Sequence, residues 1–383
     1  MKILFAPDSF KGSLSSFQAI ELLHAVTEKH FPGCQMVDLP MGDGGEGTVE
    51  ALLHALGGHY GRCTVSGPLG DPVEARYGVL NDTTAILEMA QASGLPLLGD
   101  RAPDVLHAST LGTGQLLRHL LEEGYTTVYL LLGGSATNDG GMGAATVLGI
   151  RFLDADGQCV SPDGAGLERV VSVDTSAMVP QLRQARLILM CDVKNPLLGP
   201  QGATWVYGRQ KGATPAQQTR LEAGMENYCT VLEAACGRRL QDLPGSGAAG
   251  GLAVPLLAFS RVEICSGIET VLSLVGFDDL LADVDLVVTG EGRLDAQSTQ
   301  GKVLSGIGRH CARRGVPAVA VVGCLGEGAE QIYDCGISAV VSCMGGAASL
   351  EDALARADEL FLEAADRMYR MIKVGLRLQG RAL

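Results

Sequence analysis

The sequence lacks the features of a secreted, zinc-binding or membrane-spanning protein. Its 11 cysteines form no C-x-x-C pair, so neither a disulfide framework nor a zinc knuckle is predicted, and reduced thiols fit best. The longest interior apolar run, residues 128–132, is far shorter than the roughly 20 residues that span a bilayer. Charged residues follow the first apolar run directly, at Asp8 and Lys11. We therefore expect no signal peptide and a cytoplasmic protein.

Positive charge is also scarce. The chain has 29 lysines and arginines against 43 aspartates and glutamates, a net charge of -14. This balance repels nucleic acid phosphates and acidic membrane surfaces, and no basic stripe offsets it. We therefore expect no nucleic acid and no membrane as partner. A hydrophobic content of 46% with 19% charged residues instead predicts a folded, globular protein.

Three common catalytic motifs are absent as well. The sequence contains no G-x-x-x-x-G-K-[ST], no G-x-S-x-G and no H-E-x-x-H. These absences exclude a P-loop enzyme of the Walker type, the usual α/β-hydrolase nucleophile and the zinc-binding helix that carries the third motif.

Length and strand pattern predict two α/β domains. The 383 residues exceed the size at which a single core usually keeps growing. The chain opens with strand, helix, strand and helix, a pattern typical of a parallel sheet flanked by helices, and the pattern returns near the end. We predict one discontinuous domain from residues 1–64 and 280–383, and an inserted α/β domain with a mixed sheet over 65–279. Residues 110–150 could belong to either domain.

The expected helices include residues 14–29, residues 303–314 and a last stretch that starts after Ser349. In the last helix, apolar residues recur at i, i+3 and i+4 from Leu350 to Met368. This spacing predicts a helix face buried in the core.

Five glycine-rich loops that follow apolar strands carry charged or amide side chains. In α/β sheets such loops line the ligand crevice at the carboxyl ends of the strands. The loops are DSFKGS (8–13), GDGGEGT (42–48), GGSATNDGG (133–141), CDVKNPLLG (191–199) and TGEGRLD (289–295). Their acids are Asp8, Asp43, Glu46, Asp139, Asp192, Glu291 and Asp295. Phosphoryl transfer needs acids to hold Mg²⁺ and to accept a proton, together with cations, although each acid taken singly could equally cap a helix.

The second loop has the G-x-G-x-x-G spacing of dinucleotide-binding proteins. Asp43 and Glu46 would place two negative charges where a pyrophosphate should meet the helix N-terminus. A cation or a hydroxyl-bearing substrate suits these carboxylates better. A nicotinamide dehydrogenase is therefore disfavoured.

The GGSATNDGG loop and the lysines point to an anionic ligand. Backbone N–H groups of such a loop can cradle phosphate, although close packing is an alternative reason for its glycines. Only seven lysines occur in the chain, and four of them lie in or beside glycine-containing loops: Lys11, Lys194, Lys211 and Lys302. An acidic protein that binds anions needs such local positive charge.

Together the loops resemble those of the glycerate kinase family of bacteria. The segments that carry the resemblance are APDSFKGSLS, PMGDGGEGT, LGTGQLL, GGSATNDGG, CDVKNPLLG with QKGA, PGSGAAGGL and DLVVTGEGRLDAQSTQGK, in order from Lys2 to about Gly346. The resemblance implies a Rossmann-like domain joined to a second α/β domain, with the active site in the cleft between them. It also implies ATP-dependent phosphorylation of glycerate to 2-phosphoglycerate.

On this basis we predict in-line, Mg²⁺-assisted transfer with ATP and glycerate as substrates. Asp192 is the favoured proton acceptor and Asp43 its rival, with Lys11 and Asp295 as further catalytic residues. The predicted metal ligands are Asp192, Glu291 and Asp295. The predicted substrate-binding residues are Asp8, Ser9, Lys11, Glu46, Arg293 and Lys211. The predicted nucleotide-binding residues are Gly134, Ser135, Ala136, Thr137, Asn138, Asp139, Gly247 and Gly250.

Two other functions stay open at this stage. One is a kinase of a related hydroxy acid such as tartronate or hydroxypyruvate. The other is a non-catalytic protein that binds a hydroxy acid. The sequence also leaves open whether the chain forms a homodimer.

Overall fold

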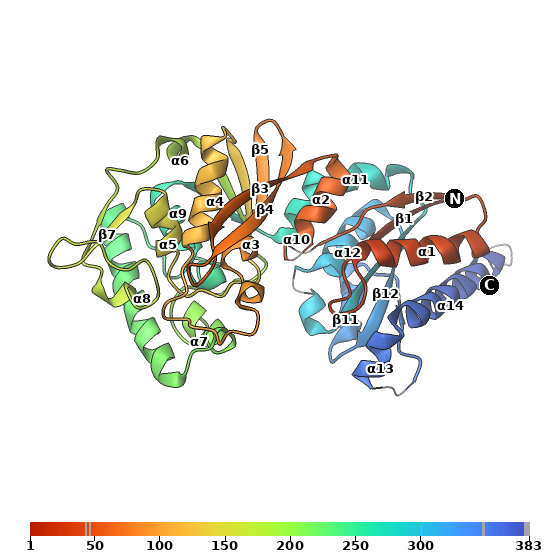
Figure 1. Cartoon of the computed structure of the whole chain (residues 1–383). Helices are drawn as coiled ribbons and strands as arrows, with labels where there is room; N and C mark the ends of the chain where they lie inside the picture. Colours follow the sequence, from red (N-terminus) through yellow and green to blue (C-terminus); the bar gives the residue numbers. More distant parts are fainter. Residues whose placement is uncertain (43, 46, 300, 347–348, 379–383) are drawn as a thin grey trace. The chain divides into compact units, whose positions relative to one another are not determined.

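The computed structural model describes all residues except 43, 46, 300, 347–348 and 379–383. The chain divides into two compact units (Figure 1). The first unit comprises Met1–Asp43 and Gly267–Leu383, and the second comprises Gly44–Ser266. The first unit is discontinuous, and residues 110–150 lie in the second.

The unit boundaries differ from the predicted ones at 64/65 and 279/280. Helix α2 (Thr48–Leu56) packs against β4 (Pro72–Asn81) and β5 (Thr84–Glu88), and β3 (His59–Ser66) pairs with β4. Helix α2 and strand β3 therefore belong to the second unit. At the other boundary, α10 (Gly267–Leu274) packs against α12 (Val303–Arg314) of the first unit.

The first unit contains a five-stranded parallel sheet in the order β13-β12-β11-β1-β2. Its strands are β1 (Lys2–Pro7), β2 (Gln35–Asp38), β11 (Leu286–Leu294), β12 (Ala318–Leu325) and β13 (Ala339–Ser342). Its remaining helices are α1 (Ser16–His30), α11 (Phe277–Leu280), α12 (Val303–Arg314), α13 (Leu350–Ala355) and α14 (Ala357–Leu378). Helices α1 and α14 share one core with Ile3, Phe5 and Val288 of the sheet. Helix α12 packs against β11 and β12.

The strand order creates a topological switch point between β1 and β11. From β1 the chain crosses to β2 on one side, whereas from β11 it crosses through α12 to β12 on the other side. In open α/β sheets, ligands bind outside the carboxyl ends of the strands at such a point. Pro7 is in register with Gly290, so Asp8 and Glu291 come next at the carboxyl ends of the two strands.

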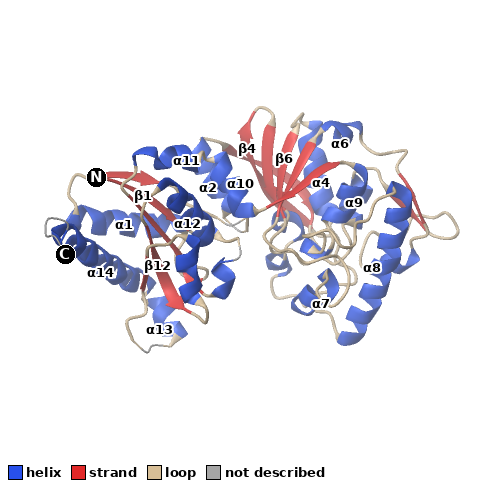
Figure 2. Cartoon of the chain, turned by 180° about the vertical axis from the view of Figure 1, so that it is seen from behind, coloured by secondary structure: helices blue, strands red, loops and turns tan. Residues whose placement is uncertain are grey.

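The second unit contains a six-stranded sheet in the order β10-β9-β6-β5-β4-β3. Strands β5, β6 (Thr127–Leu131), β9 (Arg186–Met190) and β10 (Arg261–Cys265) are parallel, whereas β4 pairs antiparallel with both β5 and β3. The other elements are α3 (Ala90–Ser93), α4 (Leu111–Glu122), α5 (Met142–Val147), α6 (Pro180–Gln184), α7 (Ala203–Tyr207), α8 (Pro215–Cys236), α9 (Ala253–Phe259) and the antiparallel strand pair β7 (Arg151–Leu153) and β8 (Ser172–Asp174). Figure 2 shows the sheet with helices on both sides.

Local sequence explains the boundaries of the longest helix in this unit. Helix α8 begins after a capping box, in which Thr214 accepts from the backbone N–H of Gln217 and the Gln217 side chain accepts in return. Pro215 occupies the first helical position, and Gly237 ends the helix with a positive φ of 68°.

The predicted fold class is confirmed, because the five-stranded sheet is parallel and the six-stranded sheet is mixed. The predicted location of the active site between the domains stays a prediction. Among the described residues, we find no helix with the length and apolar character to cross a membrane.

Candidate active site

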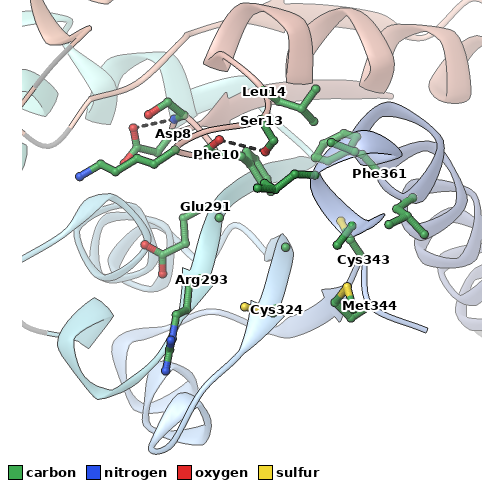
Figure 3. Close-up of a pocket in the computed structure, with 18 of the residues that line it drawn as sticks. Asp8, Phe10, Ser13, Leu14, Glu291, Arg293, Cys324, Cys343, Met344 and Phe361 are labelled. Carbon is green, nitrogen blue, oxygen red and sulfur yellow. Dashed lines mark hydrogen bonds between the residues drawn. The ribbon is translucent and has the colours of Figure 1, made fainter. Parts of the chain in front are cut away.

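A cavity of about 440 Å³ opens in the first unit at the carboxyl ends of β1, β11 and β12 (Figure 3). One part of its lining is charged, and the other part is apolar. Figure 3 shows Asp8, Glu291 and Arg293 on one side and Phe361, Cys343 and Met344 on the other. The cavity therefore offers two chemically different surfaces to one ligand.

Two nearly buried carboxylates line the charged part. Asp8 is 8% exposed and Glu291 is 6% exposed. The backbone N–H of Asp8 donates to the carbonyl of Gly290 at 2.9 Å, which continues the strand pairing one residue beyond β1. The Asp8 carboxylate accepts from the backbone N–H of Ser9 at 2.7 Å. Asp8 and Glu291 each follow one of the paired residues Pro7 and Gly290 and line the same cavity, so this part of the lining favours a bound cation.

Three cationic side chains line the same cavity: Lys11, Arg293 and Lys302. Lys11 is exposed in the loop after β1. Arg293 stands two residues beyond Glu291, and its Nε lies 3.3 Å from the Asp295 carboxylate. Lys302 is the residue that precedes the first turn of α12. The cavity thus combines the acids and cations that phosphate chemistry requires.

Phe10 fixes the loop that carries Asp8 and Lys11. Its ring is buried and meets Phe361 of α14 edge to face, with ring centroids 5.3 Å apart. Its backbone N–H donates to the carbonyl of Leu14 at 2.7 Å. Gly12 provides the positive φ of 83° that closes this tight turn. Because Phe10 anchors the loop, Lys11 can extend into solvent without losing its position.

The three predicted metal ligands have different surroundings. Glu291 lines the cavity, whereas Asp295 pairs with Arg293 and accepts from the backbone N–H of Gln297 at 2.9 Å. Asp192 belongs to the second unit. In the part of the chain that the structure describes, no three His, Cys, Asp or Glu side chains gather closely enough to hold a metal ion. Asp295 is thus better explained by its contacts with Arg293 and the following turn.

In the second unit, the loops after the four parallel strands meet at one edge of the sheet. Glu88, Leu131, Met190 and Cys265 are in register at the strand ends. Asp192 follows β9, and its carboxylate accepts from the hydroxyl of Ser266, which follows β10, at 3.0 Å. Asp192 is half-buried. A carboxylate that is held in place but still reachable can accept a proton.

The GGSATNDGG loop is built around the fully buried Asp139. Its carboxylate accepts from the N–H and hydroxyl of Thr110, both at 2.7 Å, and from the N–H groups of Gly141 and Gly143 at 3.0 and 3.2 Å. Burial raises the pKa of Asp139, and these hydrogen bonds oppose the rise. Asp139 therefore holds the loop together instead of facing a ligand.

The neighbouring side chains of the same loop also point inward. Thr137 and Asn138 are fully buried, and Asn138 Nδ2 donates to the hydroxyl of Thr204 at 3.1 Å. Ala136 and Ser135 are buried as well, whereas Gly133 and Gly134 are exposed. Of the predicted nucleotide-binding residues in this loop, only Gly134 is exposed.

Lys211 lies in the interior, and the structure does not support its predicted contact with substrate. Its Nζ donates to the carbonyl of Thr137 at 2.7 Å, and the side chain is fully buried. Burial lowers the pKa of Lys211 to about 7, while the charge of Asp139 acts in the opposite direction. The sequence placed Lys211 near a glycine but gave no sign of this burial.

Gly247 and Gly250 serve close packing, which does not support their predicted contact with nucleotide. Both are buried. A Cβ on Gly247 would lie 2.1 Å from the carbonyl oxygen of Pro196, and one on Gly250 would lie 2.2 Å from that of Thr137. The carbonyl of Gly250 also accepts from the N–H of Gly140 at 2.9 Å. This segment supports the GGSATNDGG loop from behind.

The predicted roles of Asp43 and Glu46 concern positions outside the described residues. The main feature that the sequence did not reveal is the apolar part of the cavity, which includes Phe10, Leu14, Leu354 and Phe361. Their spacing gave only the signal of a buried core.

Comparison with known proteins identifies the family. The model of the glycerate kinase family matches residues 3–373. The chain belongs to the glycerate kinase family. The glycerate kinase of Bacillus subtilis is 41% identical over 375 residues, which are 98% of each chain. The glycerate 2-kinase of Escherichia coli is 38% identical over 381 residues, covering 99% of this chain and 100% of that one.

A solved structure agrees with this membership of the glycerate kinase family. It is a crystal structure of a protein provisionally described as glycerate kinase 2, from Salmonella typhimurium LT2. It superposes with a TM-score of 0.87 at 39% identity and covers 99% of this chain and 100% of that chain. The family match spans both units, so both belong to the glycerate kinase fold and neither is an accessory domain. The resemblance predicted from the loop motifs is confirmed, and the chain is a kinase of this family.

Proposed function

We propose that the chain phosphorylates the 2-hydroxyl of glycerate with ATP and releases 2-phosphoglycerate and ADP. The relatives named glycerate kinase and glycerate 2-kinase support this proposal. The observation that carries it is the cavity at the switch point of the first unit, where Asp8 and Glu291 adjoin Lys11, Arg293 and Lys302. Phosphoryl transfer depends mainly on positioning and on neutralising charge, and this set of side chains provides both.

The cations would bind the phosphate oxygens. Lys11 and Lys302 offer point charges, and Arg293 offers a planar guanidinium suited to two oxygens of one phosphate. The net charge of the chain is -14, so these three side chains supply the positive charge that an anion requires at this cavity.

Asp8 and Glu291 fit a magnesium ion. Mg²⁺ is usually bound through one or two carboxylates together with substrate phosphates and waters, and does not need a cage of protein ligands. Two nearly buried carboxylates that line the same cavity meet that requirement. When bound, Mg²⁺ would neutralise negative charge on the phosphates. In this proposal Asp8 and Glu291 replace the predicted set of Asp192, Glu291 and Asp295.

Asp192 is our proposed proton acceptor for the glycerate hydroxyl. The hydrogen bond from Ser266 holds the carboxylate in place, and the half-buried position of Asp192 keeps it within reach of a substrate. We expect Asp192→Asn to lower kcat steeply while the Kd for ATP changes little, because an amide cannot accept the proton. Unchanged turnover would remove Asp192 from the mechanism. Asp242→Asn, an exposed acid of the same unit, is the matched control.

The test of the function is a coupled assay of ADP release with glycerate, tartronate and hydroxypyruvate as acceptors. We expect the largest kcat/KM with glycerate. Phosphorus NMR of the product should show a phosphate on the secondary carbon. Faster turnover of another acid would change the substrate assignment, and absence of ADP release with all three acids would contradict the proposal.

A further inference from the structure

The apolar half of the first-unit cavity has no role in the chemistry proposed so far. Glycerate and a triphosphate are both polar, so neither would cover the aliphatic and aromatic groups that line this half. The apolar lining residues used here are Phe10, Leu14, Met344, Leu354, Leu360 and Phe361. They come from the loop after β1, the segment after β13 and the helices α13 and α14.

In the apolar half of the cavity, some side chains are buried in the core and others are exposed to solvent. Phe10, Leu14 and Phe361 are buried and belong to the core shared with α1 and α14. On α13, by contrast, Leu350 is 75% exposed and Leu354 is 40% exposed, and both line the cavity. Leaving such side chains in water costs free energy that an apolar ligand surface would recover.

We propose that this cavity binds the nucleotide, with the adenine base on the apolar half and the phosphates on Lys11, Arg293 and Lys302. The inference rests on the proposed use of ATP and specifies where ATP binds. It assigns the nucleotide to the first unit instead of the GGSATNDGG loop, whose side chains are largely buried. The base lies on the side of α13 and α14.

The size of the cavity agrees with this occupant. Pockets for drug-sized ligands are about 300–1,000 Å³, and this cavity measures about 440 Å³. A small hydroxy acid would leave most of that volume empty and the apolar half of the cavity uncovered. A nucleotide has an apolar aromatic end and an anionic end, which is the same division as in the lining.

The test compares ADP with pyrophosphate, because the two ligands differ only by the adenosine group. Binding is measured by calorimetry on the full chain. Leu354→Gln replaces an exposed apolar side chain of the cavity lining with a polar one. We expect the Kd for ADP to rise about fivefold while the Kd for pyrophosphate is unchanged. In Lys11→Met we expect both Kd values to rise by a similar factor, since both ligands lose the same phosphate contact.

Two further variants complete the test. Val374→Gln, on an exposed valine of α14 that does not line the cavity, is the matched control and should bind both ligands like the wild type. Ala353→Phe fills the cavity from the half-buried side of α13 and should weaken ADP binding more than Leu354→Gln does. Circular dichroism confirms that each variant is folded.

Unchanged ADP binding in both Leu354→Gln and Ala353→Phe would overturn the assignment. An increase in the KM for glycerate without a change in ADP binding would overturn it as well, because the apolar half of the cavity would then bind glycerate and not the nucleotide. Failure of the proposed function has a different signature. In that case ADP binding follows the expected pattern, but the wild type releases no phosphoglycerate.

Discussion

At the scale of single residues, acidic side chains of similar appearance in the sequence have very different surroundings. Glu291 lines a cavity with cations, whereas Asp139 is fully buried and accepts four hydrogen bonds, two from Thr110 and one each from Gly141 and Gly143. Glu291 lies in β11 and Asp139 in the loop after β6, and both stand next to glycine. Burial depends on tertiary packing, so the sequence could identify the acids of the glycine loops but could not separate those that line a cavity from those that hold a loop together.

Glu291→Gln tests the metal-binding role at this scale. The amide keeps the shape of the side chain but removes the charge that would hold Mg²⁺. We expect kcat to fall about 100-fold and the Mg²⁺ concentration for half-maximal rate to rise. Steady-state kinetics over a Mg²⁺ titration measure both effects. The exposed acid Glu330 gives the control variant Glu330→Gln, and equal kinetics in the two variants would refute the role.

Lys211 predicts a dependence of stability on pH. Its pKa is 10.5 in the unfolded chain and about 7 in the folded chain, so the unfolded state binds more protons between these values, and stability rises with pH. This contribution is lost as pH falls from 10.5 to 7. The free energy of unfolding should increase by about 2 kcal/mol more between pH 7 and 9 in the wild type than in Lys211→Met.

Urea unfolding at the two pH values measures that difference. Lys194→Met removes an exposed lysine of the same unit and should follow the wild type. If Lys211→Met keeps the wild-type slope, the buried lysine is charged in the folded state at pH 9 and its burial does not lower its pKa as proposed.

At the scale of elements, hydrophobic spacing located helices accurately but could not tell what their apolar faces contact. Residues 303–314 form α12 as predicted, and α1 differs by two residues at its start. The predicted last helix is instead divided at Arg356 into α13 and α14. Phe361, Ala364 and Met368 are buried as expected, whereas Leu350 and Leu354 face a cavity. Hydrophobic periodicity predicts an apolar helix face, but that face can pack against a ligand as well as against the protein core.

Packing between loops gives a prediction at this scale. Gly250 and Gly237 share a φ of 68°, so a side chain is equally strained at both. Gly250 would add a contact of 2.2 Å with the Thr137 carbonyl, whereas no described heavy atom lies within 4 Å of a Cβ at Gly237. We expect Gly237→Ala to cost about 1 kcal/mol and Gly250→Ala at least about 2 kcal/mol more.

Urea unfolding of both variants provides the comparison. Equal losses would mean that the GGSATNDGG loop moves away from residue 250 at little cost. In that case the two loops would not form the closely packed layer that holds Asp139.

At the scale of the whole molecule, the two units differ in continuity. Residues 44–266 are one uninterrupted stretch with their own sheet and core. The first unit is assembled from both ends of the chain. A continuous stretch with its own core is expected to fold independently.

We therefore expect a fragment of residues 44–266 to fold alone. It should show a cooperative urea transition and the circular dichroism of a mixed α/β protein. The fragment 1–43, which contains only β1, α1 and β2, is the control and should be unfolded because its strands lack β11. A gradual, non-cooperative transition of the 44–266 fragment would contradict the expectation.

The pairing of β1 with β11 also has a consequence for synthesis on the ribosome. Ala6 and Thr289 are joined by a hydrogen bond although they are 283 positions apart. The first strand therefore leaves the exit tunnel long before its central neighbour exists, and the whole intervening unit can fold in the meantime. The nascent amino-terminal segment must avoid aggregation throughout that interval. Slower translation or a chaperone that delays premature association should therefore change the yield of active enzyme.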